Sequence, residues 1–365
     1  MRKNKLPYFL VIVTFALVVI GLVMLSSASV VQSYESKGNN YYYLVHQLLA
    51  GAIPGLIALI IASFIDYKKW KKFAIPFLAL TLFLLVLVFI PGIGFDYGGA
   101  RRWIAIGGFT IQPTEIVKLS FLIYLATWIE KRESSLKDLK TVFLPFVTIL
   151  LAIGFLIMQQ PDLGTMSVII FSAIAVYYVA GARLGHLAVL GFSGIGAILI
   201  LIKMAPYRMA RFTVFLNPEL DPQGIGYQIN QVLLAIGSGG LLGRGLGRSI
   251  QKYNYLPEAT GDSIFAIIAE ELGFVRIVLI ILLFAALTII GYQISKNAPD
   301  MFGKILAAGI TTWLGFQAFV NIAAMLTLVP LTGIPLPFIS YGGTALLSSL
   351  AAVGILINIA RQSKA

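Results

Sequence analysis

Long apolar runs recur along the whole of this 365-residue chain, and they constrain its fold more than any other feature. The runs are continuous rather than alternating, which excludes a transmembrane β-barrel. Most are close to the 20 or so residues that a helix needs to cross the hydrocarbon core. Charged residues make up only 12% of the chain, about half the fraction typical of a soluble domain. The sequence therefore predicts an all-α integral membrane protein, with residues 1–365 forming a single polytopic domain.

We expect ten transmembrane helices, with a long and partly helical extracytoplasmic loop between the seventh and the eighth. This loop covers about residues 205–262, which is too long for a passive connection. The eighth apolar run exceeds the thickness of a bilayer, so its helix should tilt or project beyond the membrane. The expected spans are 8–31, 44–65, 73–91, 114–130, 142–159, 164–180, 185–204, 263–294, 303–328 and 343–360.

Basic residues are unevenly divided between the two sides of this predicted bundle. The short loops opposite the termini carry only Lys37, Arg101 and Arg102. Because cytoplasmic loops are enriched in Lys and Arg, both termini are expected in the cytoplasm. The net charge of +12 also suits an anionic substrate or anionic membrane lipids, and no nucleic-acid partner is expected. The basic residues on the side of the termini are Arg2, Lys3, Lys5, Lys68, Lys69, Lys71, Lys72, Lys131, Arg132, Lys137, Lys140, Arg183, Lys296, Lys304, Arg361 and Lys364.

The predicted outer loop contains two amphipathic segments and a glycine-rich run. PYRMARFTVFLNP indicates a short helix stopped by Pro218, and YQINQVLLAIGSGG indicates a second helix ended by glycines. GGLLGRGLGRS follows, with Arg244 and Arg248 among its glycines. Backbone amides and guanidinium groups together suit a phosphate. The alternative interpretation of this run is a flexible connector.

Charged residues inside the predicted spans indicate a polar interior, because intramembrane ions are costly. Lys118 follows Glu115 by one turn at the start of the fourth span, and Glu270, Glu271 and Arg276 fall in the eighth. Arg276 is five and six residues from the glutamates, which is poor spacing for pairing on one helix. We therefore predict a pairing between Glu270 and Lys118. Such a pair either belongs to a functional cavity or locks the bundle as an interhelical salt bridge.

Two aspartates lie at the edges of predicted spans. Asp262 lies where a glycine-containing turn becomes an apolar helix, so it is either a helix N-cap or a reactive carboxylate that faces a cavity. Asp162, in QQPDLGT, is typical of a turn. The Pro/Gly-broken segment 330–344 is tolerated at membrane depth only where it is buried in protein or lines a wet cavity. The chain has no cysteine and two histidines, so a thiolate site is excluded and a histidine-based site is poorly supported.

Seven motifs in order make the chain resemble the SEDS family (shape, elongation, division, sporulation), the FtsW/RodA proteins. The KYNYLPEA and ISYGGT motifs are closer to FtsW-type than to RodA-type members. Where the family commonly has Thr before its essential Asp, this chain has Gly261 before Asp262. The motifs are GGARRWI (98–104), IQPTEIVKL (111–119), QQPDLGT (159–165), YRMARFTVFLNP (207–218), GYQINQVLLAIGSGGLLGRGLG (226–247), YNYLPEATGDSIFAIIAEELG (253–273) and PLPFISYGGTALL (335–347).

The resemblance implies a peptidoglycan glycosyltransferase of the bacterial cytoplasmic membrane, active in cell division or cell-shape maintenance. It would polymerise lipid II, release undecaprenyl pyrophosphate, and work with a class B penicillin-binding protein. Asp262 would be the general base. No cofactor is firmly implied, and a divalent cation, Mg²⁺ or Mn²⁺, is left open. Candidate substrate contacts are Arg101, Arg102, Lys118, Asp162, Arg208, Arg211, Arg244 and Glu258, and Glu115 and Glu270 are candidate structural or coupling residues.

Two other classes of function stay open at this stage. A lipid II flippase would also be a polytopic bundle with intramembrane ions and broken helices. The chain shows no clear inverted repeat, however, and its polar residues concentrate on one side. A non-catalytic scaffold that activates the penicillin-binding protein would leave Asp262 dispensable.

Overall fold

The computed structural model describes residues 5–97 and 100–363 as a helical bundle with one small sheet. Gly98 and Gly99, which open the GGARRWI motif, and the basic residues Arg2, Lys3 and Lys364 lie outside the described residues. The helices are α1 (Leu6–Ala28), α2 (Val30–Lys37), α3 (Tyr42–Gln47), α4 (Ile53–Phe64), α5 (Trp70–Leu87), α6 (Pro113–Glu130), α7 (Leu144–Met158), α8 (Leu163–Val179), α9 (Leu184–Met204), α10 (Pro206–Leu216), α11 (Ile225–Gly239), α12 (Ile264–Asn297), α13 (Met301–Met325) and α14 (Gly343–Gln362).

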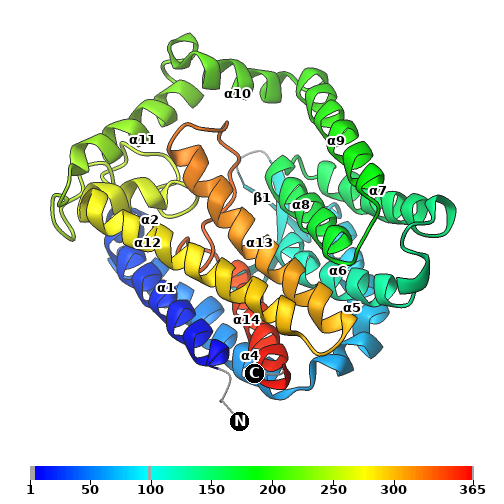
Figure 1. The fold of residues 1–365 in the computed structure, drawn as a ribbon. Coiled ribbons are helices and arrows are strands. Elements are labelled where there is room, and N and C mark those ends of the chain that lie inside the picture. Colours follow the sequence, from blue (N-terminus) through cyan, green and yellow to red (C-terminus); the bar gives the residue numbers. More distant parts are fainter. Residues whose placement is uncertain (1–4, 98–99, 364–365) are drawn as a thin grey trace.

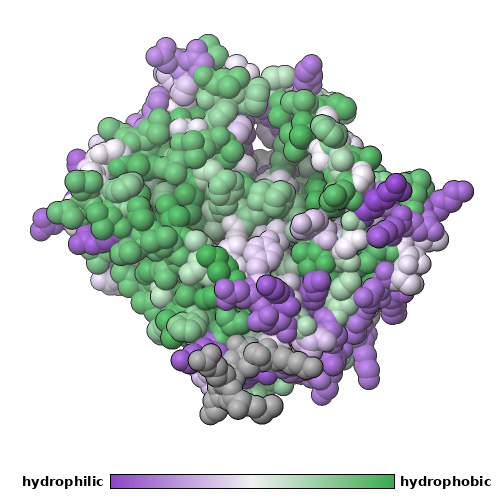
Figure 2. All heavy atoms as spheres, viewed as in Figure 1, coloured by the Kyte–Doolittle hydropathy of each residue, from purple (hydrophilic) through white to green (hydrophobic). Residues whose placement is uncertain are grey.

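Within the described residues, eight helices are long and apolar enough to cross a membrane. Figure 2 shows the broad apolar surface that they form, with hydrophilic residues gathered toward its edges. The two other expected spans fall on α8, which is shorter, and on α6, which carries three charged residues. The structure confirms a multi-pass helical membrane protein, and the count of ten spans stays a prediction. The eight spans are Leu6–Ala28, Tyr42–Phe64, Tyr67–Leu87, Leu139–Met158, Leu184–Met204, Ile264–Asn297, Met301–Met325 and Gly343–Gln362.

The centre of the bundle is formed by α13 and α14, which are buried along most of their length. α13 packs against α12, α8 and α6, and α14 packs against α4. Small residues permit these close approaches, as is usual between membrane helices. A side chain at Gly354 of α14 would collide with the Leu59 carbonyl of α4, and one at Gly309 of α13 would meet Val176 and Leu122.

The two amphipathic helices expected in the outer loop are present as α10 and α11. In Figure 1, α9, α10 and α11 form an arch that passes over the orange α13. The apolar face of α11 is buried at Ile229, Val232 and Ala235, and the helix packs against α12. α10 buries only Val214, so the arch is closely packed on the α11 side and loosely packed on the α10 side.

A three-stranded antiparallel sheet precedes α6, and the prediction of an all-α protein missed it. Its strands are β1 (Gly94–Tyr97), β2 (Ala100–Ile106) and β3 (Phe109–Ile111), in the order β1-β2-β3. Gly107 and Gly108 join β2 to β3 with φ of 57° and 84°. Two consecutive positive φ values match the tight turn that favours a hairpin. The Gly-Gly pair was therefore a usable sequence signal for strands in this loop.

Helix α12 is broken at Gly273, where φ is 78° and ψ is 175°. The glycine-rich loop 240–245 lies beside the break and takes over its hydrogen bonds. The amides of Arg244 and Gly245 donate to the carbonyls of Glu270 and Glu271, and the amides of Phe274 and Val275 donate back to loop carbonyls. Non-helical backbone at membrane depth is tolerated when protein groups satisfy it in this way. The sequence did not predict this break, and the tilt or projection expected for the long helix stays a prediction.

Candidate active site

Asp262 lies one residue before the N-cap of α12, and its side chain does not cap the helix. The N-cap is Ser263, which makes no side-chain bond to the free amides of the first turn. The Ser263 hydroxyl donates instead to Asp262 Oδ1, at 3.3 Å. The structure therefore excludes the N-cap interpretation of Asp262 and leaves its carboxylate available for other chemistry.

The backbone around Asp262 is held by α13 and by the Pro/Gly-broken segment that precedes α14. Asn321 Nδ2 donates to the Asp262 carbonyl at 2.9 Å and to the Ile334 carbonyl at 2.8 Å. Ser340 Oγ donates to the Gly261 carbonyl at 2.7 Å. The segment around residue 334 is thus buried in protein, which is one of the two alternatives that its composition left open. Asn321 and Ser340 escaped the sequence analysis because their role depends on contacts with a distant turn.

The electrostatic surroundings of Asp262 combine opposing influences. Burial, and then the negative charge of Glu258, raise the pKa of Asp262 from 3.8 to about 7, against lowering effects of Arg211 and Ser263. Glu258 has a positive φ of 52°, and its carbonyl accepts from the amides of Gly261 and Ser263. A carboxyl with a pKa near neutral pH is suited to proton abstraction, because effective general bases titrate near the working pH.

The predicted arginine contacts are distributed over α10 and the sheet. Arg211 donates to the Leu331 carbonyl at 3.2 Å, which brings α10 to the segment beside Asp262. Arg208, one turn earlier, donates to the Leu201 carbonyl at 3.1 Å. Arg102 donates to the carbonyls of Gln160 and Pro161, and Arg101 is exposed, with its Nε 3.8 Å from Asp96. Of these four, Arg211 is the one that acts on the Asp262 carboxylate.

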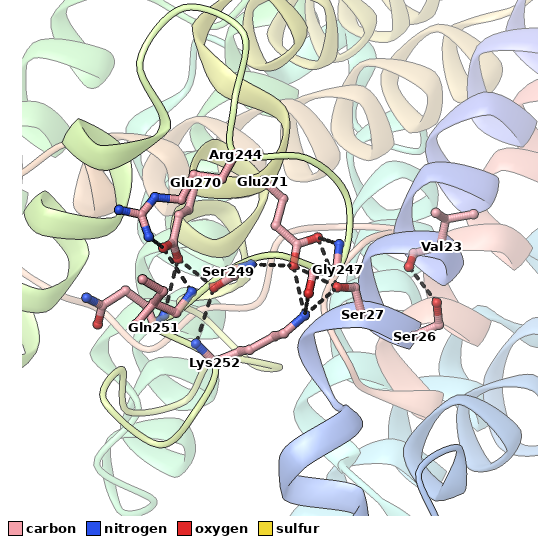
Figure 3. Close-up of polar contacts among 11 residues, drawn as sticks. Val23, Ser26, Ser27, Arg244, Gly247, Ser249, Gln251, Lys252, Glu270 and Glu271 are labelled. Carbon is pink, nitrogen blue, oxygen red and sulfur yellow. Dashed lines mark hydrogen bonds and ion pairs between the residues drawn. The ribbon is translucent and has the colours of Figure 1, made fainter.

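Residues 247–251, at the end of the glycine-rich run and just after it, form a cradle of backbone amides that the protein's own carboxylates fill (Figure 3). Glu270 accepts from the amides of Ile250 and Gln251 and from the Ser249 hydroxyl. Glu271 accepts from the amides of Gly247 and Ser249. These amides are therefore not available to a phosphate, and the flexible-connector interpretation does not describe the segment either. Arg244 belongs to the same cluster, since its Nη1 lies 3.5 Å from Glu270.

Glu271 also joins this loop to α1 and to Lys252. Lys252 Nζ lies 3.1 Å from Glu271 Oε1 and donates to Ser27 Oγ and to the Gly247 carbonyl. Ser27 of α1 in turn donates to both Glu271 oxygens. All three side chains are buried. A buried charge pair with its remaining groups hydrogen-bonded fixes one arrangement of the segments that it joins.

Lys118 pairs with Glu115 on its own helix, so the predicted pairing of Lys118 with Glu270 is wrong. Its Nζ lies 2.8 Å from Glu115 Oε1 and 2.7 Å from Gln317 Oε1.

Asp162 is the N-cap residue of α8, because its side chain accepts from the Thr165 amide at 2.9 Å. This local role agrees with the prediction that Asp162 belongs to a turn.

Arg276 binds backbone carbonyls rather than an acid, because its Nη1 donates to the carbonyls of Leu242 and Leu272.

No group of three or more His, Asp or Glu side chains within residues 5–97 and 100–363 could hold a metal ion. We therefore derive no catalytic step through a divalent cation.

Comparison with known proteins gives relatives along the full length of the chain. The stage V sporulation protein E of Bacillus subtilis (strain 168) is 42% identical over 363 residues, covering 100% of this chain and 99% of that protein. The probable peptidoglycan glycosyltransferase FtsW of Trichlorobacter lovleyi is 41% identical and covers 100% and 95%. Several further relatives carry the name FtsW, in agreement with an FtsW-type member.

Two solved structures share the fold. A chain from the structure described as "Structural coordination of polymerization and crosslinking by a peptidoglycan synthase complex" matches with a TM-score of 0.79 at 27% identity, covering 97% of both chains. The rod shape determining protein RodA of Thermus thermophilus matches with a TM-score of 0.71 at 27% identity, covering 97% and 96%. Residues 8–365 match the family described as cell cycle protein, and the chain therefore belongs to the FtsW/RodA/SpoVE family.

Proposed function

We propose that this protein polymerises lipid II into glycan strands at the outer face of the bacterial cytoplasmic membrane, with Asp262 as its general base. It is a peptidoglycan glycosyltransferase of the cell division or cell-shape class, as the names of its FtsW relatives support. The observation that carries the role of Asp262 is its setting: a partly buried carboxyl beside α12 that caps no helix and has a pKa raised to about 7.

In the proposed reaction, a sugar hydroxyl of one substrate attacks the anomeric carbon of the other. Asp262 accepts the hydroxyl proton as the new glycosidic bond forms. The bond from the anomeric carbon to the lipid pyrophosphate breaks, and the pyrophosphate leaves with the bonding electrons. The configuration inverts, so one base is sufficient and no covalent intermediate is needed. Between turnovers, Asp262 returns its proton to water.

The departing pyrophosphate needs cations, and α10 offers the best-placed ones. Arg211 is exposed and already lies within electrostatic reach of Asp262. Arg208 lies one turn before Arg211 on the same face of α10. Guanidinium groups bind phosphate oxygens with two parallel hydrogen bonds. Arg101 and Arg102 on β2 are the second candidate pair, whereas Arg244, already paired with Glu270, is the weakest candidate.

The surroundings of the protein follow from this assignment. Both termini would lie in the cytoplasm and loop 205–262 outside, because the short loops on the opposite side carry few basic residues. The partner would be a class B penicillin-binding protein. The structural match to a chain of a peptidoglycan synthase complex that couples polymerization and crosslinking supports such a partner.

Polymerisation of purified lipid II by the detergent-solubilised protein tests this proposal. The comparison is between wild type, Asp262→Asn and Asp221→Asn, with and without the co-purified penicillin-binding protein. Asp221→Asn makes the same chemical change at a loop residue that accepts from the amides of Gly224 and Ile225. Glycan from wild type and Asp221→Asn, but none from Asp262→Asn, is the expected result. Glycan from Asp262→Asn at the wild-type rate would leave only the flippase or scaffold function.

A further inference from the structure

A short hydrogen-bonded chain connects helix α11 of the outer loop to the Asp262 carboxylate. Gln228 Nε2 on α11 lies 3.2 Å from Ser263 Oγ and donates to it. Ser263 Oγ in turn donates to Asp262 Oδ1 at 3.3 Å. A serine hydroxyl has one proton to donate and lone pairs that accept. One hydroxyl can therefore serve both bonds at once.

The arrangement is not what a structural serine at this position would show. Serine is a preferred N-cap residue because its hydroxyl normally accepts from an amide of the first helical turn. Ser263 occupies the N-cap of α12 without making that bond. Its side chain is fully buried and is directed instead toward a carboxylate and an amide donor. The Ser263 hydroxyl therefore binds the Asp262 carboxylate and the Gln228 amide group in place of an amide of the first helical turn.

We propose that Ser263, oriented by Gln228, is a positioning residue that fixes the Asp262 carboxylate for proton abstraction. This inference rests on the proposed role of Asp262 as base. The donated hydrogen bond favours the ionised carboxylate and restricts its rotation. Because Gln228 belongs to α11, any displacement of that helix changes the hydrogen bonding of the base. Helix α11 thereby helps to position the base through Gln228.

Two charged groups also act on the same carboxylate and must stay in place in the test. Glu258, four residues earlier in the chain, opposes ionisation of Asp262, and Arg211 on α10 favours it. The contacts from α13 and from the segment before α14 are uncharged, since Asn321 and Ser340 bind backbone carbonyls. Ser340→Ala is therefore a matched control, because it removes a hydroxyl that binds the turn at Gly261 without removing a donor to the carboxylate.

The test is the pH dependence of lipid II polymerisation by Ser263→Ala, Ser263→Thr, Gln228→Ala and Ser340→Ala. Ser263→Ala should move the acid-side midpoint upward by roughly one to two pH units, the size expected for one lost hydrogen bond to a charged group. Gln228→Ala should give a smaller shift in the same direction. Ser263→Thr keeps the hydroxyl and should restore the midpoint, and Ser340→Ala should leave the midpoint unmoved whatever its rate.

The outcomes separate this inference from the proposed function. Loss of all polymerisation in Asp262→Asn, together with an unmoved midpoint in Ser263→Ala, would overturn the inference alone. Equal shifts in Ser263→Ala and Ser340→Ala would also overturn it, because the effect would then be a general loosening of the turn. Full activity in Asp262→Asn would overturn the role of the base itself. If Ser263→Ala does not fold, as judged by gel filtration, the midpoint of Gln228→Ala decides.

Discussion

Replacing Asp262 with Asn should make the protein more stable at alkaline pH, although it abolishes the proposed activity. The pKa of Asp262 is raised from 3.8 to about 7 in the folded protein. Well below pH 3.8 the carboxyl is protonated in both the folded and the unfolded chain and does not change the free energy of unfolding. As the pH rises toward 7, the unfolded chain ionises first, so the folded state loses stability. Above pH 7 the carboxyl is ionised in both states and the loss of free energy of unfolding is complete. Asparagine does not ionise, so Asp262→Asn avoids this loss.

The magnitude follows from a shift of about three pKa units, each worth about 1.4 kcal/mol. This gives an upper value of about 4 kcal/mol, and partial solvent access to Asp262 lowers the expectation to about 2–4 kcal/mol. At roughly 2 °C per kcal/mol, Asp262→Asn should unfold some 4–8 °C above wild type at pH 8. The difference should shrink steadily toward pH 4.

Thermal unfolding in detergent, followed by tryptophan fluorescence at pH 8, 6 and 5, measures this difference. Asp221→Asn is the control, since it removes a carboxylate that accepts two backbone amides and should not stabilise the protein. A melting temperature of Asp262→Asn equal to or below that of wild type at pH 8 would refute the reasoning. So would a difference that does not depend on pH.

Three further predictions concern the base and the two structural clusters. Wild-type polymerisation should rise with pH to a midpoint near 7, where Asp262 ionises, and a flat rate from pH 5.5 to 8.5 would contradict this. Glu271→Ala should lower the free energy of unfolding by about 3–5 kcal/mol, because it leaves Lys252 buried without its carboxylate partner. Thermal unfolding measures this loss, and an unchanged melting temperature would show that the Glu271–Lys252 pair does not stabilise the fold. Gly273→Ala should lower the free energy of unfolding by about 3 kcal/mol, because the backbone conformation at Gly273 is nearly restricted to glycine and a side chain would collide with loop 240–245. Gly237→Ala, which meets open space, should be neutral in the same assay.

The parts of the fold that follow local patterns were predictable from sequence. Helices α10 and α11 could be predicted because their apolar residues recur at helical spacing between Pro and Gly signals. Exposure of the segment before α14 to lipid could be excluded from its broken backbone, although burial in protein and the lining of a wet cavity both stayed open. Asp262 was located by its place between a turn and an apolar helix and by the family resemblance.

The features that were missed depend on contacts between distant segments. The pairing of Glu270 was wrong because no local pattern shows that loop 240–252 folds back onto α12 and offers it amides. For the same reason, neither interpretation of the glycine-rich run, a phosphate site or a flexible connector, anticipated that Glu270 and Glu271 would bind the amides of residues 247–251. Asn321 and Gln228 reach the site from other helices, and polar residues on long helices do not reveal which turn they face.

The break at Gly273 has a consequence for how the protein sits in membranes of different thickness. A continuous helix would transmit any change of tilt in its spanning half directly to the turn that holds Asp262. Here loop 240–245 binds both sides of the break, because its amides donate to the carbonyls of Glu270 and Glu271 and its carbonyls accept from the amides of Phe274 and Val275. Helices adjust to bilayer thickness mainly by tilting. A change of tilt in segment 274–297 would therefore reach loop 240–245 as well as segment 264–272, so the thickness of the bilayer would act on the loop that also carries Arg244.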